Sequence, residues 1–190
     1  MKLWLIRHGL TSLGERGCYQ GRLDLGLSES GRAALQTAAF SPDHVYVSPS
    51  RRARETAAIL FPGAEQRVVP GLREMDFGLF EGRSWREMEH DPAYRAWIDG
   101  LCCGRCPEGE DRAGFSARVL AAFNQILARE QGSERLVLVA HGGTQMALLE
   151  HWGVPERDYY RWQRPCGCGW ELERMEDGSL LVLREVSFTK

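Results

Sequence analysis

The sequence predicts an α/β fold in which a mostly parallel sheet is covered by helices on both faces. Two short segments, 3–6 and 136–140, are continuously apolar, as strands buried on both faces are. Segments with helical spacing alternate with the predicted strands, and this alternation is typical of parallel sheets with helical crossovers. The 190 residues suffice for a substantial core, so we expect a single domain over residues 1–190.

The individual elements can be assigned in chain order from apolar spacing, capping residues and turn residues. Strand 2–6 is followed by a helix expected over 28–39, which Ser28 or Ser30 would cap. A Glu-Asp-Gly turn at 176–178 predicts a C-terminal hairpin. The remaining expected elements are a strand at 45–47, a helix ending near 60, a strand at 67–69, an ordered loop over 71–85, one or two helices within 84–100, a helix over 109–130, a strand at 136–140 and a helix over 143–152.

Composition excludes several classes of function. A formal net charge of −2 gives no general attraction to nucleic acid or to an anionic membrane, so an anion site must be a local cluster of basic groups. No apolar run reaches the roughly 18 residues that a membrane span needs. The short apolar N-terminus is not typical of a secretion signal. We therefore expect a soluble, cytoplasmic protein without nucleic-acid or membrane partners.

Six cysteines are present, and in a cytoplasmic protein we expect them to be free thiols. One alternative is a four-thiolate zinc site, if the fold brought two pairs together. The C-x-C spacing of the second pair is less usual in such sites than C-x-x-C, so we expect no metal. The four cysteines in question are Cys103, Cys106, Cys166 and Cys168.

Both strongly apolar strands end in a histidine followed by glycine. Arg7-His8-Gly9 follows the first strand, and His141-Gly142-Gly143 follows the second. Because ligands of parallel sheets bind at the carboxyl ends of the strands, the two histidines are expected to share one site. An arginine-rich segment, 51–54, opens a predicted helix after another strand. Guanidinium groups and helix N-termini both bind phosphate well, so this edge predicts a phosphate pocket.

Four ordered motifs resemble the histidine phosphatase superfamily, also called phosphoglycerate-mutase-like. They are "RHG" with the nearby Thr11, "SPSRRARET", "LREMDFGLFEG" and "VAHGG", and they span residues 3–143. The resemblance implies a three-layer α/β sandwich and hydrolysis of a phosphomonoester through a phosphohistidine, without metal or other cofactor. It also implies a small-molecule phosphomonoester as the partner. A homodimer is compatible with the habit of the family, although no stretch of this chain requires one.

The resemblance also implies a role for each matching residue. His8 corresponds to the nucleophile, and Glu74 to the proton donor, with Glu81 as the next candidate. A nucleophilic histidine would split a very slow hydrolysis into two easier transfers, each assisted by a general acid or base. Neighbouring arginines are expected to disfavour protonation of His8 and keep it nucleophilic. The corresponding phosphate-binding residues are Arg7, Arg52 and His141, and the corresponding substrate-binding residues are Thr11, Gln20, Gly21 and Gly142.

Two positions depart from the pattern of the superfamily. Gly14 stands where many members carry an asparagine, and Leu10 stands where a glutamate is common. The side-chain contact of that asparagine with phosphate must be absent, or replaced by Ser12 or a backbone N–H. These departures bear on substrate recognition rather than on the chemistry.

Within the superfamily, the chain most resembles the alpha-ribazole phosphatases of cobalamin biosynthesis, in "KLWLIRHGLT", "LREMDFGLFEG" and "CPEGED". A broad-specificity phosphatase of sugars or other small molecules, a phosphoglycerate mutase and a non-catalytic interaction module remain as alternatives. Trp85, Tyr94, Trp97 and the loop 101–110 are candidates to line the mouth of the site, where aromatic rings could stack on a heterocyclic base. Packing of helix against sheet is the other interpretation of these aromatic residues. Three histidines have no matching context and are expected to be structural or exposed: His44, His90 and His151.

Overall fold

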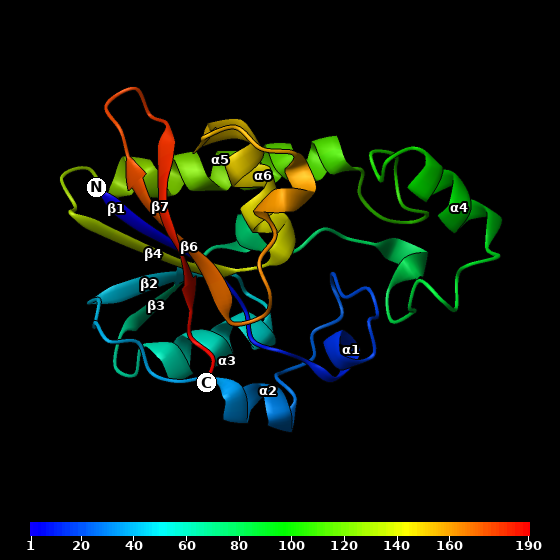
Figure 1. Ribbon diagram of the computed structural model, residues 1–190, viewed down its shortest axis with the longest axis horizontal. Helices are drawn as coiled ribbons and strands as arrows, with labels where there is room; N and C mark the ends of the chain where they lie inside the picture. The colour runs from blue at the N-terminus through cyan, green and yellow to red at the C-terminus, as the bar shows by residue number, and fades with distance from the viewer.

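Seven strands form one mixed sheet in the computed structural model, which describes all residues 1–190 (Figure 1). The strand order is β3-β2-β4-β1-β6-β7-β5. The first four of these strands are mutually parallel, and β6 is antiparallel to both of its neighbours. The expectation of a mostly parallel sheet is confirmed. The strands are β1 (Lys2–Arg7), β2 (His44–Val47), β3 (Glu65–Val68), β4 (Arg135–Ala140), β5 (Gly153–Val154), β6 (Cys168–Arg174) and β7 (Leu180–Ser187).

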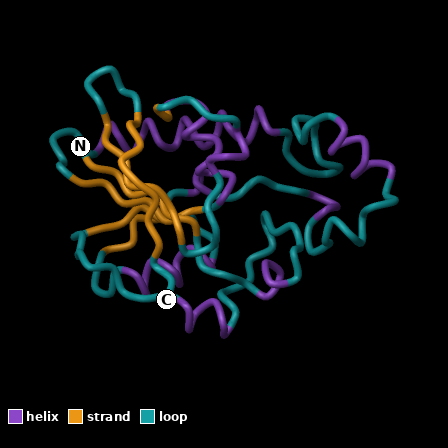
Figure 2. The backbone as a smooth tube through the Cα atoms, viewed as in Figure 1, coloured by secondary structure: helices purple, strands orange, loops and turns teal.

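Helices cover both faces of the sheet and give three layers (Figure 2). Alternate side chains of a strand point to opposite faces, so β1 and β4 contribute to two separate hydrophobic clusters. Leu3, Leu5, Leu136 and Leu138 pack with apolar residues of α5 (Arg112–Arg129) and α6 (Gly142–Trp152). On the opposite face, Trp4, Ile6, Val137 and Val139 pack with residues of α3 (Arg51–Leu60).

A lobe built from the connection between β3 and α5 extends beyond the carboxyl edge of the sheet (Figure 1). It contains the 3-10 turns η1 (Pro70–Leu72) and η2 (Gly78–Phe80), and the helix α4 (Pro92–Asp99). The helix α1 (Ser12–Glu15), which follows β1, lies on the same side of the molecule. The lobe therefore faces the strand ends at which both His-Gly motifs were found.

The predicted elements are confirmed except at two places. The helix expected over 28–39 is α2 (Glu29–Ala34), which ends five residues earlier than expected and is capped by Ser28. Leu35 adopts an extended conformation, is buried, and forms an isolated bridge with Thr189. Of the expected helices within 84–100, α4 forms, while 85–90 make turns. No helix combines the length and apolar character needed to cross a membrane.

Candidate active site

The histidines that follow β1 and β4 lie beside one another. These strands are adjacent and parallel, with Arg7 paired to Ala140, so both strands end at the same edge of the sheet. The ring centroids of His8 and His141 are 5.2 Å apart, and both side chains are buried. The expectation that the two strand ends meet at one place is confirmed.

His8 is held as a neutral imidazole with one free nitrogen. Its Nδ1 lies 2.7 Å from the carbonyl oxygen of Gly9. Because a carbonyl only accepts hydrogen bonds, Nδ1 carries the proton and Nε2 keeps its lone pair. Burial lowers the pKa of His8 well below its ordinary value, and the charges of Arg52 and Arg7 lower this pKa further. The predicted influence of the arginines is confirmed in direction, although burial is the larger cause.

Two arginines reach this histidine pair from different elements. Arg7 donates from Nη1 to the carbonyl of Arg164 at 2.9 Å, and its buried Nε has no partner in the protein. Arg52, on α3, is fully buried and donates to the carbonyls of Leu23 and Gly21 at 3.0 and 2.9 Å. Its Nη2 lies 3.4 Å from Nδ1 of His141. The loop around 20–23 therefore covers the guanidinium of Arg52.

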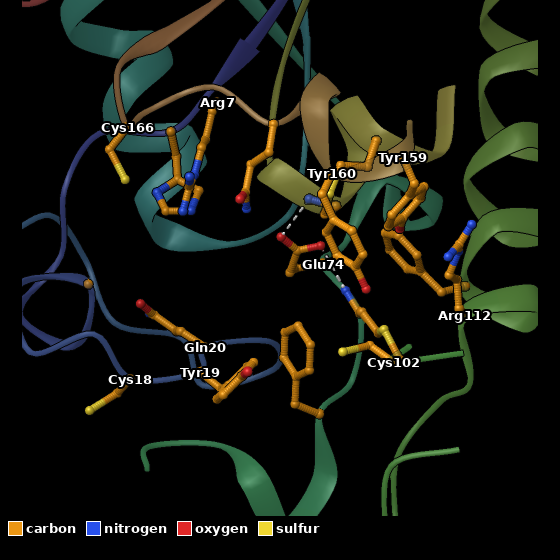
Figure 3. A pocket seen from close by; sticks show the side chains of 18 of the residues that line it. Arg7, Cys18, Tyr19, Gln20, Glu74, Cys102, Arg112, Tyr159, Tyr160 and Cys166 are labelled. Atoms are coloured by element: carbon orange, nitrogen blue, oxygen red, sulfur yellow. Dashed lines mark hydrogen bonds between the residues drawn. The ribbon is translucent and has the colours of Figure 1, made fainter. Parts of the chain in front are cut away.

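Glu74 is the buried carboxyl group of the site. One oxygen accepts the N–H of Met75 at 3.0 Å, and the other accepts the N–H of Gly143 at 3.1 Å (Figure 3). Burial nevertheless raises the pKa of Glu74 above its ordinary value of 4.5, despite these hydrogen bonds and the nearby arginines. A carboxyl group with this raised pKa can hold a proton and release it to a substrate.

A cavity of about 310 Å³ opens in front of these groups. Arg7, His8, Glu74 and Gly143 form its polar end. Figure 3 shows that Tyr159, Tyr160, Arg112 and Cys102 lie across the cavity from Arg7. The rest of the lining is mainly apolar or aromatic: Tyr19, Phe77, Trp97, Cys102, Phe115, Met146, Tyr159 and Tyr160.

The family model of the histidine phosphatase superfamily (branch 1) matches residues 3–186. This chain belongs to the histidine phosphatase superfamily. Adenosylcobalamin/alpha-ribazole phosphatase of Salmonella typhimurium is 32% identical over 160 residues, which are 78% of each chain. A Hydrogenobacter thermophilus protein, provisionally named phosphoserine phosphatase 2, is 32% identical over 157 residues, 78% of this chain and 76% of its own.

A solved structure, phosphoglycerate mutase from Thermus thermophilus, superposes with a TM-score of 0.74 at 30% identity. The match covers 98% of this chain and 99% of that one. The fold is therefore that of the phosphoglycerate-mutase-like proteins, and the chain is a phosphatase of this superfamily. Relatives of equal similarity carry different substrate names, so overall identity does not decide the substrate.

Of the phosphate-binding residues expected from the superfamily, only Arg7 lines the cavity in this structure. Arg52 and His141 do not line it, and both are fully buried. Nε2 of His141 is 2.7 Å from Oγ of Ser48, so this histidine has protein partners on both nitrogens. The expected phosphate-binding residues therefore lie close together, but Arg52 and His141 are hydrogen-bonded to other groups of the protein.

The candidate substrate-binding residues divide in the same way. Thr11 and Gln20 line the cavity, and the hydroxyl of Thr11 donates to Oε1 of Gln20 at 2.6 Å. Gly21 instead lets its loop approach the backbone that follows Glu74, because a Cβ there would lie 2.0 Å from the carbonyl oxygen of Met75. Gly142 gives the same kind of room to Gln163, whose Nε2 would lie 2.6 Å from an added Cβ.

Ser12, one of the two expected replacements for the missing asparagine, is exposed and does not reach the cavity. The N–H of Gly14 is already used, because it donates to the hydroxyl of Thr11 at 3.0 Å. The second candidate for the acid, Glu81, accepts the N–H groups of Arg22 and Leu23 at 2.7 and 2.8 Å and does not line the cavity. Glu81 also accepts the N–H of Phe77 at 3.2 Å, so its observed contacts are with backbone N–H groups of two loops.

The aromatic lining differs from the one expected. Trp97 lines the cavity, but Tyr94 is buried and shares a hydrogen bond with the hydroxyl of Tyr19, and Trp85 is exposed outside the cavity. Sequence reasoning missed Tyr159 and Tyr160, which belong to the 3-10 turn η3 (Tyr159–Trp162). The available signal was the aromatic cluster "YYRW" shortly after the second His-Gly motif.

The four cysteines of the alternative zinc site are not brought together. No three or more histidine, cysteine, aspartate or glutamate side chains come together in a way that could hold a metal ion. All six cysteines are free, with Cys106 buried in the core and Cys166 lining the cavity. The histidines without motif context behave as expected: His44 is hydrogen-bonded to Glu130, and His90 and His151 are exposed.

Proposed function

We propose that this chain is a metal-independent phosphomonoesterase that works through a phosphohistidine on His8. The observation that carries the proposal is a free Nε2 on a neutral, buried histidine, at the same end of one cavity as a buried carboxyl group of raised pKa. A nucleophile and a proton donor in these two states match the first half of a double displacement.

In the first step, the phosphoryl group lies at the polar end of the cavity. Nε2 of His8 forms a bond to phosphorus while the bond from phosphorus to the leaving oxygen breaks. Glu74 gives its proton to that oxygen, so the product leaves as a neutral alcohol. The guanidinium of Arg7, whose Nε has no protein partner, stabilises the charge on the phosphoryl oxygens.

In the second step, the Glu74 carboxylate takes a proton from a water molecule, and the water oxygen attacks phosphorus. The N–P bond breaks, and its electron pair returns to Nε2 of His8. Orthophosphate leaves, His8 is again neutral, and Glu74 is again protonated. One carboxyl group therefore acts first as the acid and then as the base.

Arg52 and His141 complete the phosphate pocket in this proposal. Arg52 is bound to backbone carbonyls of the loop 20–23, and these carbonyls occupy the N–H groups that a phosphate would need. We infer that phosphate replaces them as the acceptor, with a shift of that loop. Gln20, which lines the cavity and belongs to this loop, would then approach the substrate.

We propose alpha-ribazole 5'-phosphate as the substrate. The part of the cavity across from Arg7 carries Tyr159 and Tyr160, whose rings suit a flat heterocyclic group. The cation there, Arg112, is paired with Glu150 and stacks on the ring of Tyr159, so it is compensated and does not favour a second acidic group on the substrate. This favours a neutral leaving group over phosphoserine or a phosphoglycerate. The Salmonella relative named for this activity adds support.

The test is a comparison of kcat/KM in EDTA for alpha-ribazole 5'-phosphate, phosphoserine, 3-phosphoglycerate, fructose 1,6-bisphosphate and p-nitrophenyl phosphate. The proposal predicts a preference for the first by orders of magnitude. Uniformly low rates that vanish in His8→Ala would support the phosphohistidine mechanism but contradict the proposed substrate. Formation of 2-phosphoglycerate would indicate a mutase. No turnover of any substrate, together with no binding of vanadate, would indicate an interaction module.

A further inference from the structure

We propose that Gln145 is a positioning residue that aims the guanidinium of Arg7 at the phosphoryl group; the inference rests on the phosphate-binding role proposed for Arg7. Gln145 lies in the first half of α6, and its side chain is fully buried. It does not line the cavity, so it acts through other groups.

The carboxamide of Gln145 is hydrogen-bonded only to backbone groups. Its Nε2 donates to the carbonyl of Leu5 in β1 at 3.2 Å and to the carbonyl of Cys168 at the start of β6 at 3.3 Å. Its Oε1 accepts the N–H of Arg164 at 2.9 Å. Both donors and the acceptor oxygen of the amide are therefore used. Together they tie both ends of the segment 164–168 to β1 and α6.

The segment 164–168 in turn holds the groups that would meet phosphate. The carbonyl of Arg164 accepts Nη1 of Arg7 at 2.9 Å, which is the hydrogen bond that orients this guanidinium. The N–H of Gly167 lies 3.0 Å from the carbonyl oxygen of His8 and 3.2 Å from that of Arg7. Nε of Arg7 is buried without a partner, so the orientation set by Arg164 decides where its remaining N–H groups point.

Pro165 transmits the restraint from the Arg164 N–H to the Arg164 carbonyl. A residue before proline is confined mainly to extended conformations, so fixing its N–H also limits the direction of its carbonyl. The side chain of Arg164 is engaged elsewhere, with Glu185 at 2.6 Å and over the ring of Trp170. The connection from Gln145 to Arg7 therefore runs through the backbone.

The test compares three variants by calorimetric titration with inorganic phosphate and by kinetics on p-nitrophenyl phosphate and an alkyl phosphate. Gln145→Met keeps the length of the side chain and removes its hydrogen bonds. Thr144→Val is the matched control, because the hydroxyl of this buried neighbour has no partner. Pro165→Ala, at an exposed position, loosens the Arg164 carbonyl without changing the core.

We expect Gln145→Met to weaken phosphate binding about tenfold, which corresponds to about 1.4 kcal/mol. Both substrates share the phosphoryl group, so kcat/KM falls by the same factor for each. Pro165→Ala shows a smaller loss in the same direction, and Thr144→Val shows none. In an Arg7→Met background, Gln145→Met has no further effect on phosphate affinity.

Unchanged phosphate affinity in both Gln145→Met and Pro165→Ala, with only a lower melting temperature, would overturn the positioning role. If Gln145→Met does not fold, the titration of Pro165→Ala decides. Full hydrolytic activity in His8→Ala would instead refute the phosphohistidine mechanism. The phosphate titrations would still measure the effect of Gln145 on Arg7, so the two failures are distinguishable.

Discussion

Gly143→Ala should disable the proton donor although Glu74 itself is not replaced. A Cβ at position 143 would lie 2.2 Å from Oε1 of Glu74 and 2.9 Å from Cζ of Phe115, so the carboxyl group must move. That displacement breaks its hydrogen bonds with the N–H groups of Met75 and Gly143. General acid catalysis contributes about 10²- to 10⁴-fold, and a displacement of about 1 Å can cost about 10²-fold. We therefore expect kcat/KM for an alkyl phosphate to fall by about 10²-fold or more.

The leaving group separates this cause from a general disturbance of the fold. Nitrophenolate leaves without needing a proton. In the same variant, kcat/KM for p-nitrophenyl phosphate should therefore fall far less than kcat/KM for an alkyl phosphate. Gly104→Ala is the control, because an added Cβ there meets nothing within 4 Å. Steady-state kinetics of both variants on both substrates are the assay. Equal losses on the two substrates, or no loss on either, would refute the role of Glu74 as the acid.

Three further predictions concern pH, the aromatic end of the cavity and stability. Hydrolysis needs neutral His8 and protonated Glu74. As the pH increases, kcat/KM should therefore rise through the lowered pKa of His8 and then fall through the raised pKa of Glu74. A pH profile of Glu74→Gln should lack the falling limb. Tyr159→Ala should lower kcat/KM for alpha-ribazole 5'-phosphate by up to about tenfold, because it removes an aromatic ring that would stack on the heterocyclic base. The value for glycerol phosphate should stay unchanged, and competition kinetics between the two substrates can measure the difference. Tyr46→Phe removes the buried hydrogen bond of 2.7 Å to Glu130, far from the cavity, so urea unfolding should show a loss of about 1.5–3 kcal/mol with unchanged kcat.

Local patterns were sufficient to predict most of the secondary structure. β1 and β4 are buried on both faces, and their continuous apolar runs show this directly. The helix expected over 28–39 was wrong beyond Ala34 because of a contact that no local pattern contains. Leu35 leaves the helix to bridge Thr189 near the other end of the chain.

The site was predictable where it follows motifs and unpredictable where it depends on tertiary packing. The strand-end motifs predicted that His8 and His141 would meet, and they do. No spacing rule predicted that carbonyls of the loop 20–23 would cover Arg52. Nor did any place Tyr159 opposite Arg7, because that depends on how η3 lies over the cavity.

Trapping and locating the phosphoenzyme would test the phosphohistidine mechanism without reference to any particular substrate. The protein is mixed briefly with a phosphomonoester labelled in its phosphoryl group, quenched in alkali, and digested for mass spectrometry. We expect one acid-labile, alkali-stable phosphoryl group on Nε2 of His8, which is absent in His8→Ala and decays to orthophosphate at the rate of turnover. Turnover with no trapped phosphoryl group under rapid quench, or with the group on another residue, would contradict this mechanism.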